Sequence, residues 1–156
     1  MKKKTLFFII LMAVLIIAIV ILALVINKNH SSTALQSYDS VEEAVENANF
    51  DLMYSDRVAG YPATSYKSND NTVEVLYGDK AFTRKTYGNE DNSGITKDYS
   101  EVAEHDINGM KVTFKGENGL VFLAVWNYNG YSYSIGIDDD KGVNEDDMTE
   151  YVSDTR

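Results

Sequence analysis

Three Asn-Gly pairs, at positions 108–109, 118–119 and 129–130, constrain the fold of this chain more than any other feature. Asn-Gly is the strongest short signal for a β-hairpin, because a type I′ turn needs a positive φ at both of its central residues. Apolar and polar residues alternate on both sides of each pair, which is the period of a strand with one buried face. The second half of the chain is therefore predicted to form four antiparallel strands.

The last of these turns predicts the pairing of two aromatic strands. A two-residue Asn129-Gly130 turn places Tyr128 opposite Tyr131 and Trp126 opposite Tyr133. Trp126 and Tyr133 are then expected in the core, since a one-residue slip would turn the whole apolar set to the other face. Tyr128 and Tyr131 flank the turn and are expected to be half-exposed. These two tyrosines are the candidate ligand contacts.

The other two turns extend the same apolar face. The 108–109 turn pairs Ile107 with Met110, whereas a three-residue loop ending at Gly119 is expected to pair Phe114 with Phe122. On this register the shared face carries Met110, Val112, Phe114, Phe122, Ala124, Trp126, Tyr131, Tyr133, Ile135 and Ile137. His105 is expected on the same face, opposite Val112, as a neutral and hydrogen-bonded imidazole. The opposite face is expected to expose an apolar patch around Val121, Leu123 and Val125.

Two short helices are predicted at the ends of this β-rich region. Ser40 and Glu43 form a capping box, and small apolar residues at helical spacing follow over 41–48. Asn144 can cap a second helix in which Met148, Tyr151 and Val152 share one stripe. The fold class is therefore predicted to be α+β: an antiparallel meander of about six to seven strands, with the short first helix and the C-terminal helix packed on one face.

Residues 6–26 form an uncharged apolar run that predicts a transmembrane helix. At 1.5 Å per residue the run spans about 31 Å, the thickness of a bilayer's hydrocarbon core. A cleavable signal sequence is the alternative, but its apolar region is normally shorter. The expected organisation is a cytoplasmic stub over 1–5, an uncleaved signal anchor over 6–26, a polar tether over 27–38 and an extracytoplasmic domain over 39–156.

Charge predicts the orientation and excludes one class of partner. Three Lys precede the apolar run and Lys28 follows it, so the N-terminus is expected in the cytoplasm and the domain outside the cell. All 24 acidic residues but only 10 of the 14 basic residues lie beyond Lys28, a formal net charge of −14 for that part. Such a surface repels phosphate backbones, so a nucleic-acid partner is not expected. The expected partners are the membrane and another envelope or membrane protein.

The sequence offers little support for catalysis, metals or cofactors. It has no Cys and two His, one of them in the tether, and it lacks the common nucleotide-binding and nucleophile motifs. The acidic loops 89–94 and 138–143 do not combine a Gly at position 6 with a Glu at position 12, as a calcium loop requires. We therefore expect no enzyme, no metal site and no cofactor. The alternatives are a glycan-acting enzyme with a carboxylate pair and a purely structural subunit of an envelope complex.

The second half of the chain resembles a known family. Residues 106–112 (DINGMKV) and 124–135 (AVWNYNGYSYSI), followed by an acidic helix, are similar to the extracytoplasmic domain of unknown function 4367. The resemblance covers about residues 60–155. It implies an α+β domain in a membrane-anchored protein of Gram-positive bacteria, with which the absence of Cys agrees. It implies no catalytic residues.

The predicted anchor can be tested in whole cells. We expect the chain to stay at its full mass in the membrane fraction, because the apolar run is long enough to span the bilayer and lacks a cleavage site next to it. A protease added outside intact protoplasts should then remove the domain beyond residue 38. Immunoblots with antibodies against the domain would measure both properties. Release of a shortened chain into the medium would contradict the uncleaved anchor.

Overall fold

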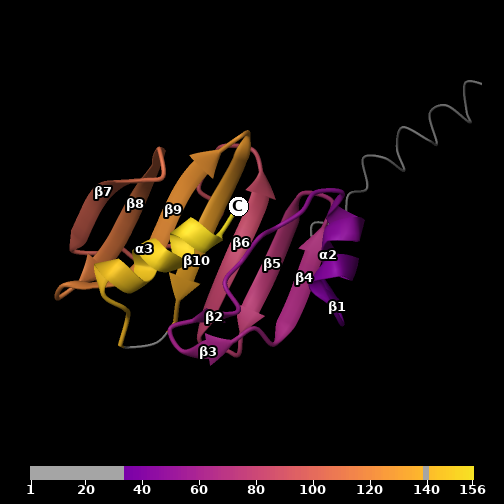
Figure 1. Ribbon diagram of the computed structural model, residues 1–156, viewed down its shortest axis with the longest axis horizontal. Helices are drawn as coiled ribbons and strands as arrows, with labels where there is room; N and C mark the ends of the chain where they lie inside the picture. Colours follow the sequence, from indigo (N-terminus) through magenta and orange to yellow (C-terminus); the bar gives the residue numbers. More distant parts are fainter. Residues whose placement is uncertain (1–33, 139–140) are drawn as a thin grey trace, which may run out of the picture. The chain divides into compact units, whose positions relative to one another are not determined.

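The computed structural model describes residues 34–138 and 141–156, so the predicted membrane segment 6–26 lies outside the described residues. The described chain forms ten strands and two helices (Figure 1). In chain order these are β1 (Gln36–Tyr38), α2 (Val41–Ala48), β2 (Arg57–Val58), β3 (Tyr61–Pro62), β4 (Ser65–Asn69), β5 (Thr72–Tyr77), β6 (Ala81–Tyr87), β7 (Glu101–Ile107), β8 (Met110–Glu117), β9 (Leu120–Tyr128), β10 (Tyr131–Ile137) and α3 (Glu145–Asp154).

Eight of the strands form one antiparallel sheet in the order β1-β4-β5-β6-β10-β9-β8-β7. The predicted mostly antiparallel architecture with an early and a C-terminal helix is confirmed, although the sheet has more strands than expected. It is also not a single meander. The chain leaves β6, crosses one face of the sheet over residues 88–100, builds β7 to β10 and returns so that β10 pairs with β6. Residues 36–38, which the sequence assigned to the tether, form the edge strand β1.

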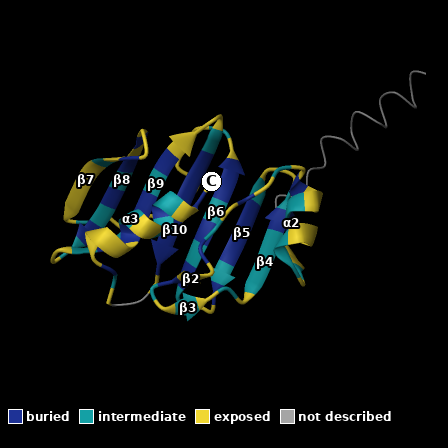
Figure 2. Ribbon diagram, in the orientation of Figure 1, coloured by how far each residue is buried: buried dark blue, intermediate teal, exposed yellow. Residues whose placement is uncertain are grey.

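Both helices and the segment 49–64 cover one face of the sheet, here called the helix face (Figure 1). Its core joins alternate residues of the central strands to Ala44 of α2 and to Met148 and Val152 of α3. The central strands are accordingly buried, whereas β7 is mostly exposed (Figure 2). Trp126 and Tyr133 lie in this core with their rings stacked at 5.2 Å, as the sequence predicted.

The helix boundaries follow from their caps. Ser40 Oγ accepts a hydrogen bond from Glu43 N, and Asn49 in the left-handed region ends α2. Asn144 Oδ1 accepts from Asp147 N at 2.8 Å at the start of α3. Both caps satisfy amides that the helix itself leaves unpaired. Neither helix in the described ranges is long and apolar enough to cross a membrane.

All three Asn-Gly turns have positive φ at both residues, with values between 50° and 82°. The register of the first and last turns is confirmed. The register of the middle turn is wrong: Phe114 lies opposite Ala124 and not opposite Phe122. The loop is a two-residue turn, and an irregularity at Lys115/Gly116 then shifts the pairing. The two changes together keep Phe114 on the core face.

The same irregularity removes Phe122 from the helix face. Its ring stacks on Tyr99 of the crossover segment, with centroids 6.1 Å apart. Gly116 sits at this point because a Cβ there would lie 2.0 Å from the carbonyl oxygen of Leu120. The expectation that Phe122 shares the core face with Ala124 and Trp126 is therefore wrong.

The opposite face, here called the crossover face, is partly covered by residues 88–100. Arg84 on β6 donates hydrogen bonds to the carbonyls of Asn92 and Ser93 and so ties this segment to the sheet. Leu123 is fully buried on this face and Val125 is half-buried, whereas the irregularity in β9 turns Val121 into the core of the helix face. The prediction of an exposed apolar patch around these three residues is therefore wrong. Local sequence shows neither the crossover that covers Leu123 nor the irregularity that turns Val121 to the other face.

Gly136 on β10 provides a test of how tightly this face is packed. A Cβ at this position would lie 2.3 Å from the ring of Phe82 and 3.0 Å from Ile95 Cδ1. We expect Gly136→Ala to destabilise the protein by about 1–3 kcal/mol, the usual cost of overpacking, in urea denaturation. The Phe82→Leu change should recover part of the loss in that background. Ser134→Ala, on the same strand and face, is the control; equal losses for both variants would argue against a steric cause.

Candidate functional site

Tyr128 and Tyr131 face each other across the Asn129-Gly130 turn on the helix face, as predicted. Tyr128 is 41% exposed and Tyr131 is half-buried. The structure adds Tyr87 at the end of β6, opposite Tyr131, and its side chain is 67% exposed. The rings of Tyr87 and Tyr131 meet edge to face, with centroids 5.7 Å apart and an interplanar angle of 81°. We refer to Tyr87, Tyr128 and Tyr131 as the tyrosine cluster.

A buried lysine supports the cluster from below. The Lys85 side chain is 7% exposed, and its Nζ lies 4.6 Å from the ring centroid of Tyr131, 5.4 Å from Tyr133 and 5.5 Å from Phe50. The ammonium donates a hydrogen bond of 2.6 Å to the carbonyl of Asp51. A cation held over ring faces is attracted by their quadrupoles, and the attraction grows as water is excluded.

Burial lowers the pKa of Lys85, and the nearby Asp51 carboxylate acts in the opposite direction. The ion pair is weak, because Nζ lies 3.9 Å from Asp51 Oδ1 and that carboxylate is almost fully exposed. The rings and the carbonyl are therefore the main partners of this cation. The Tyr131 ring in turn contacts Lys85, Phe50 and Tyr87. Tyr131 is consequently the packed member of the tyrosine cluster.

Phe50, Lys85 and Tyr87 were missed by sequence reasoning. Lys85 and Tyr87 do follow Ala81 and Thr83 at a spacing of two, which places them on the same face of β6. This alternation predicts which side chains of β6 share a face, but it does not predict which strand lies next to β6. Only the pairing of β6 with β10 brings these residues next to Tyr131.

The crossover face carries a cleft of about 660 Å³ between the β5–β6 turn, the crossover and the end of β10. Its apolar wall is formed by Leu76, Phe82, Ile95, Tyr99 and Ile137. The basic groups that line it already have partners, and the carboxylates of Asp79 and Asp138 line it as well. Lys97 Nζ lies 3.2 Å from Glu117, and Arg84 pairs with Glu74 and with two carbonyls of the crossover. The two basic groups of the cleft are thus engaged within the protein.

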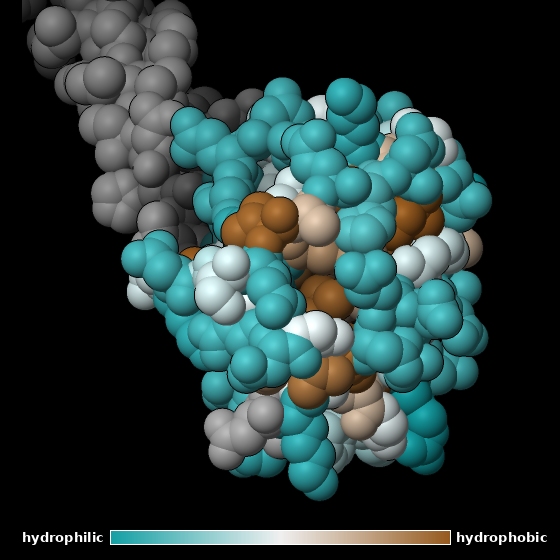
Figure 3. All heavy atoms as spheres, turned by 90° about the vertical axis from the view of Figure 1, so that its left-hand side faces the viewer, coloured by the Kyte–Doolittle hydropathy of each residue, from teal (hydrophilic) through white to brown (hydrophobic). Residues whose placement is uncertain are grey.

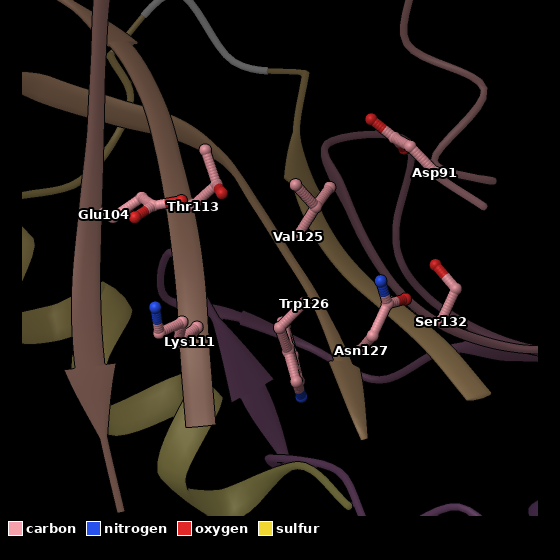
Figure 4. Close-up of a pocket in the computed structure, with 8 residues that line it drawn as sticks. All are labelled: Asp91, Glu104, Lys111, Thr113, Val125, Trp126, Asn127 and Ser132. Carbon is pink, nitrogen blue, oxygen red and sulfur yellow. The ribbon is translucent and has the colours of Figure 1, made fainter. Parts of the chain in front are cut away.

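A second, smaller hollow of about 310 Å³ lies on the same face over β7 to β10 (Figure 4). Asp91 and Glu104 stand on opposite sides of it, with Val125 between them (Figure 4). Desolvation raises the pKa of Asp91, but hydrogen bonds from Ser93 and the ion pair with Lys115 outweigh it, and the net shift is downward. A glycosidase acid needs the opposite shift. Asp91 is therefore unsuited to the role of the acid in such a pair.

The remaining sequence candidates find little reinforcement. His105 lies opposite Val112 as expected, but its buried Nε2 has no hydrogen bond and lies 3.9 Å from Glu145 Oε1. Its ring instead packs on Phe114, with centroids 4.4 Å apart. Within residues 34–138 and 141–156 no three His, Cys, Asp or Glu side chains come together as a metal site.

The chain matches no protein-family model, no curated protein and no solved structure. The resemblance to the domain of unknown function 4367 therefore depends on the residue pattern alone. The tyrosine cluster is the site that the geometry favours.

The buried ring next to Lys85 predicts a pH dependence. Burial raises the pKa of Tyr133 to about 12, from 10.0. A phenol whose pKa is raised on folding contributes stability that is complete below pH 10 and is lost as the pH rises to about 12. Tyr133→Phe should therefore weaken the alkaline loss of unfolding free energy by about 1–2 kcal/mol. Urea denaturation between pH 9 and 12 measures this; Tyr128→Phe, an exposed phenol, is the control, and identical slopes in both variants would contradict the assignment.

Proposed function

We propose that this chain is a non-catalytic binding module, anchored by residues 6–26 with its domain outside the cell, and that the tyrosine cluster is its contact surface. The observation that carries the proposal is the exposure of the Tyr87 and Tyr128 side chains on either side of the packed Tyr131. The apolar run and the charge difference across it support the anchor and its orientation. The residue pattern shared with the domain of unknown function 4367 supports the same location.

Exposed tyrosines suit binding for a physical reason. A tyrosine ring offers a large apolar face with a polar tip and few rotatable bonds, so its ordering on binding costs little. Tyrosine is accordingly enriched among the residues that dominate binding energy. In this domain the edge-to-face contact with Tyr131 orders the Tyr87 ring before any ligand arrives. Such preorganisation reduces the entropic cost of binding further.

The open shape of the surface favours an extended ligand over a small molecule. Small-molecule sites are normally concave and bury most of the ligand. The tyrosine cluster lies instead at the ends of β6, β9 and β10 beside a tight turn. Flat ring faces in this position suit a glycan strand or a protein surface of the cell envelope. Both ligand classes stack on aromatic side chains, and the experiment below separates them.

The proposed surface can be tested by capture from envelope. Full-length chain in detergent micelles would be used to pull down partners from solubilised membrane and from wall glycan. We expect Tyr87→Ala/Tyr128→Ala to lose at least about tenfold in captured material, since a hot-spot ring is worth about 2 kcal/mol or more. The measurement is quantitative mass spectrometry for proteins and sugar analysis for glycan.

The matched control is Met53→Ala, which truncates another exposed apolar side chain that is not part of the cluster. It should leave capture unchanged. Thermal melting of each variant would show that both remain folded. Equal capture by the parent and the double tyrosine variant would show that the tyrosine cluster is not the contact surface.

A further inference from the structure

Strand β7 forms one margin of the sheet, and in the part of the chain that the structure describes only β8 pairs with it. The strand is seven residues long and most of its side chains are exposed (Figure 2). Val102, in particular, is 62% exposed. The other margin, β1, is only three residues long. A long edge strand presents a row of backbone donors and acceptors to which another chain can add.

The register identifies which backbone groups point outward. Ile107 and Met110 close the two-residue turn, so they form a hydrogen-bonded pair. Hydrogen-bonded and non-hydrogen-bonded pairs alternate along an antiparallel ladder. The N–H and C=O groups of Val102, Glu104 and Asp106 therefore point away from β8. Their side chains lie on the crossover face, beside the smaller hollow.

The side chains on this margin are acidic. Glu101 Oε2 accepts a hydrogen bond from Gly119 N, and Asp106 Oδ1 accepts one from Gly109 N. Glu104 lies between them and makes no hydrogen bond or ion pair with another described residue. It stands beside Thr113 of β8 at the rim of the hollow (Figure 4). Viewed from this margin, exposed apolar atoms form a broken column flanked by hydrophilic side chains (Figure 3).

We propose that β7 binds an extended, basic segment of a partner protein as an added antiparallel strand. Backbone hydrogen bonds to residues 102, 104 and 106 supply the pairing, and a Lys or Arg opposite Glu104 supplies the selectivity. The charge of the chain points the same way, since its formal net charge is −10 at pH 7. On β8, Lys111 lies opposite Asp106 and Lys115 opposite Val102, so Glu104 is the acidic group of this edge that favours a cationic strand.

A second copy of the chain is a poor occupant of the same edge. Two β7 strands that pair antiparallel about their centre would place Glu104 opposite Glu104 and Val102 opposite Asp106. Like charges directly opposite each other are destabilising in a sheet. Acidic side chains on edge strands are a common protection against such self-pairing.

This inference is independent of the tyrosine cluster. The cluster lies on the helix face at the ends of β6, β9 and β10, whereas β7 is the margin beyond β8. Tyr87→Ala/Tyr128→Ala should therefore leave strand addition at β7 unchanged. Failure of one proposal leaves the other standing.

The test uses full-length chain in detergent micelles and a blocked, fluorescent seven-residue peptide. The peptide carries Lys, Lys and Val at its second, fourth and sixth positions and Thr elsewhere, so that the Lys residues face Asp106 and Glu104. Fluorescence anisotropy measures its binding. We expect saturable binding that becomes at least about tenfold weaker when both Lys are replaced by Glu.

Backbone methylation separates strand addition from simple charge attraction. N-methyl groups at the second, fourth and sixth peptide residues remove the donors that face β7, and should abolish binding. N-methyl groups at the third and fifth residues face away and should be tolerated. Equal effects of the two patterns would overturn the proposal, because a purely electrostatic contact does not depend on which amides are free.

Two variants of the chain complete the test. Val102→Pro removes an outward N–H that makes no internal bond, so it should weaken peptide binding at least about tenfold while the melting temperature changes little. Glu104→Lys should reverse the preference between the basic and the acidic peptide. Unchanged binding by a folded Val102→Pro variant would overturn the proposal. Concentration-dependent self-association through β7 in sedimentation, without peptide binding, would overturn it as well.

Discussion

Strand β10 pairs with β6 over seven residue pairs, from Tyr131 opposite Tyr87 to Ile137 opposite Ala81. This ladder joins the two halves of the sheet. Strands β4 to β6 form one half and β7 to β10 the other, and no other pair of the described strands connects them. The ladder places residues that lie some 50 positions apart in the chain side by side. Long-range pairing of this kind forms only if its contacts offset the entropic cost of closing a long loop. The continuous apolar core on the helix face provides that stabilisation.

Strand β6 carries two largely buried cations, on opposite faces of the sheet, and each is stabilised in a different way. Lys85 on the helix face is held by the rings of Phe50, Tyr131 and Tyr133 and by one backbone carbonyl. Arg84 on the crossover face forms an ion pair with Glu74 and donates to two crossover carbonyls. A buried charge is costly unless it has such partners. Lys85 therefore orders the tyrosine cluster, and Arg84 orders the crossover.

The two proposed contact surfaces arise from different exposed parts of the same sheet. At the strand ends beside the tight turn the aromatic rings are only partly covered by the core. The tyrosine cluster therefore exposes ring faces to a ligand. The margin at β7 leaves main-chain groups unpaired, so it offers hydrogen bonds with an acidic flank. A glycan or protein surface suits the first, and an extended basic segment suits the second. A module with both of the proposed surfaces would hold two components together.

Local sequence was enough to predict both helices, their caps and two of the three Asn-Gly registers, because capping, turn geometry and alternation are properties of neighbouring residues. It also placed Trp126 and Tyr133 in the core and Tyr128 and Tyr131 at a half-exposed turn. It misplaced Phe122, because the irregularity at Lys115/Gly116 depends on a close backbone approach to Leu120. The tertiary structure alone decided that β10 lies beside β6, that Lys85 and Tyr87 join the tyrosine cluster, and that the crossover buries Leu123. Each of these depends on which distant strands pair, and the period of a strand gives its buried face but not its neighbour.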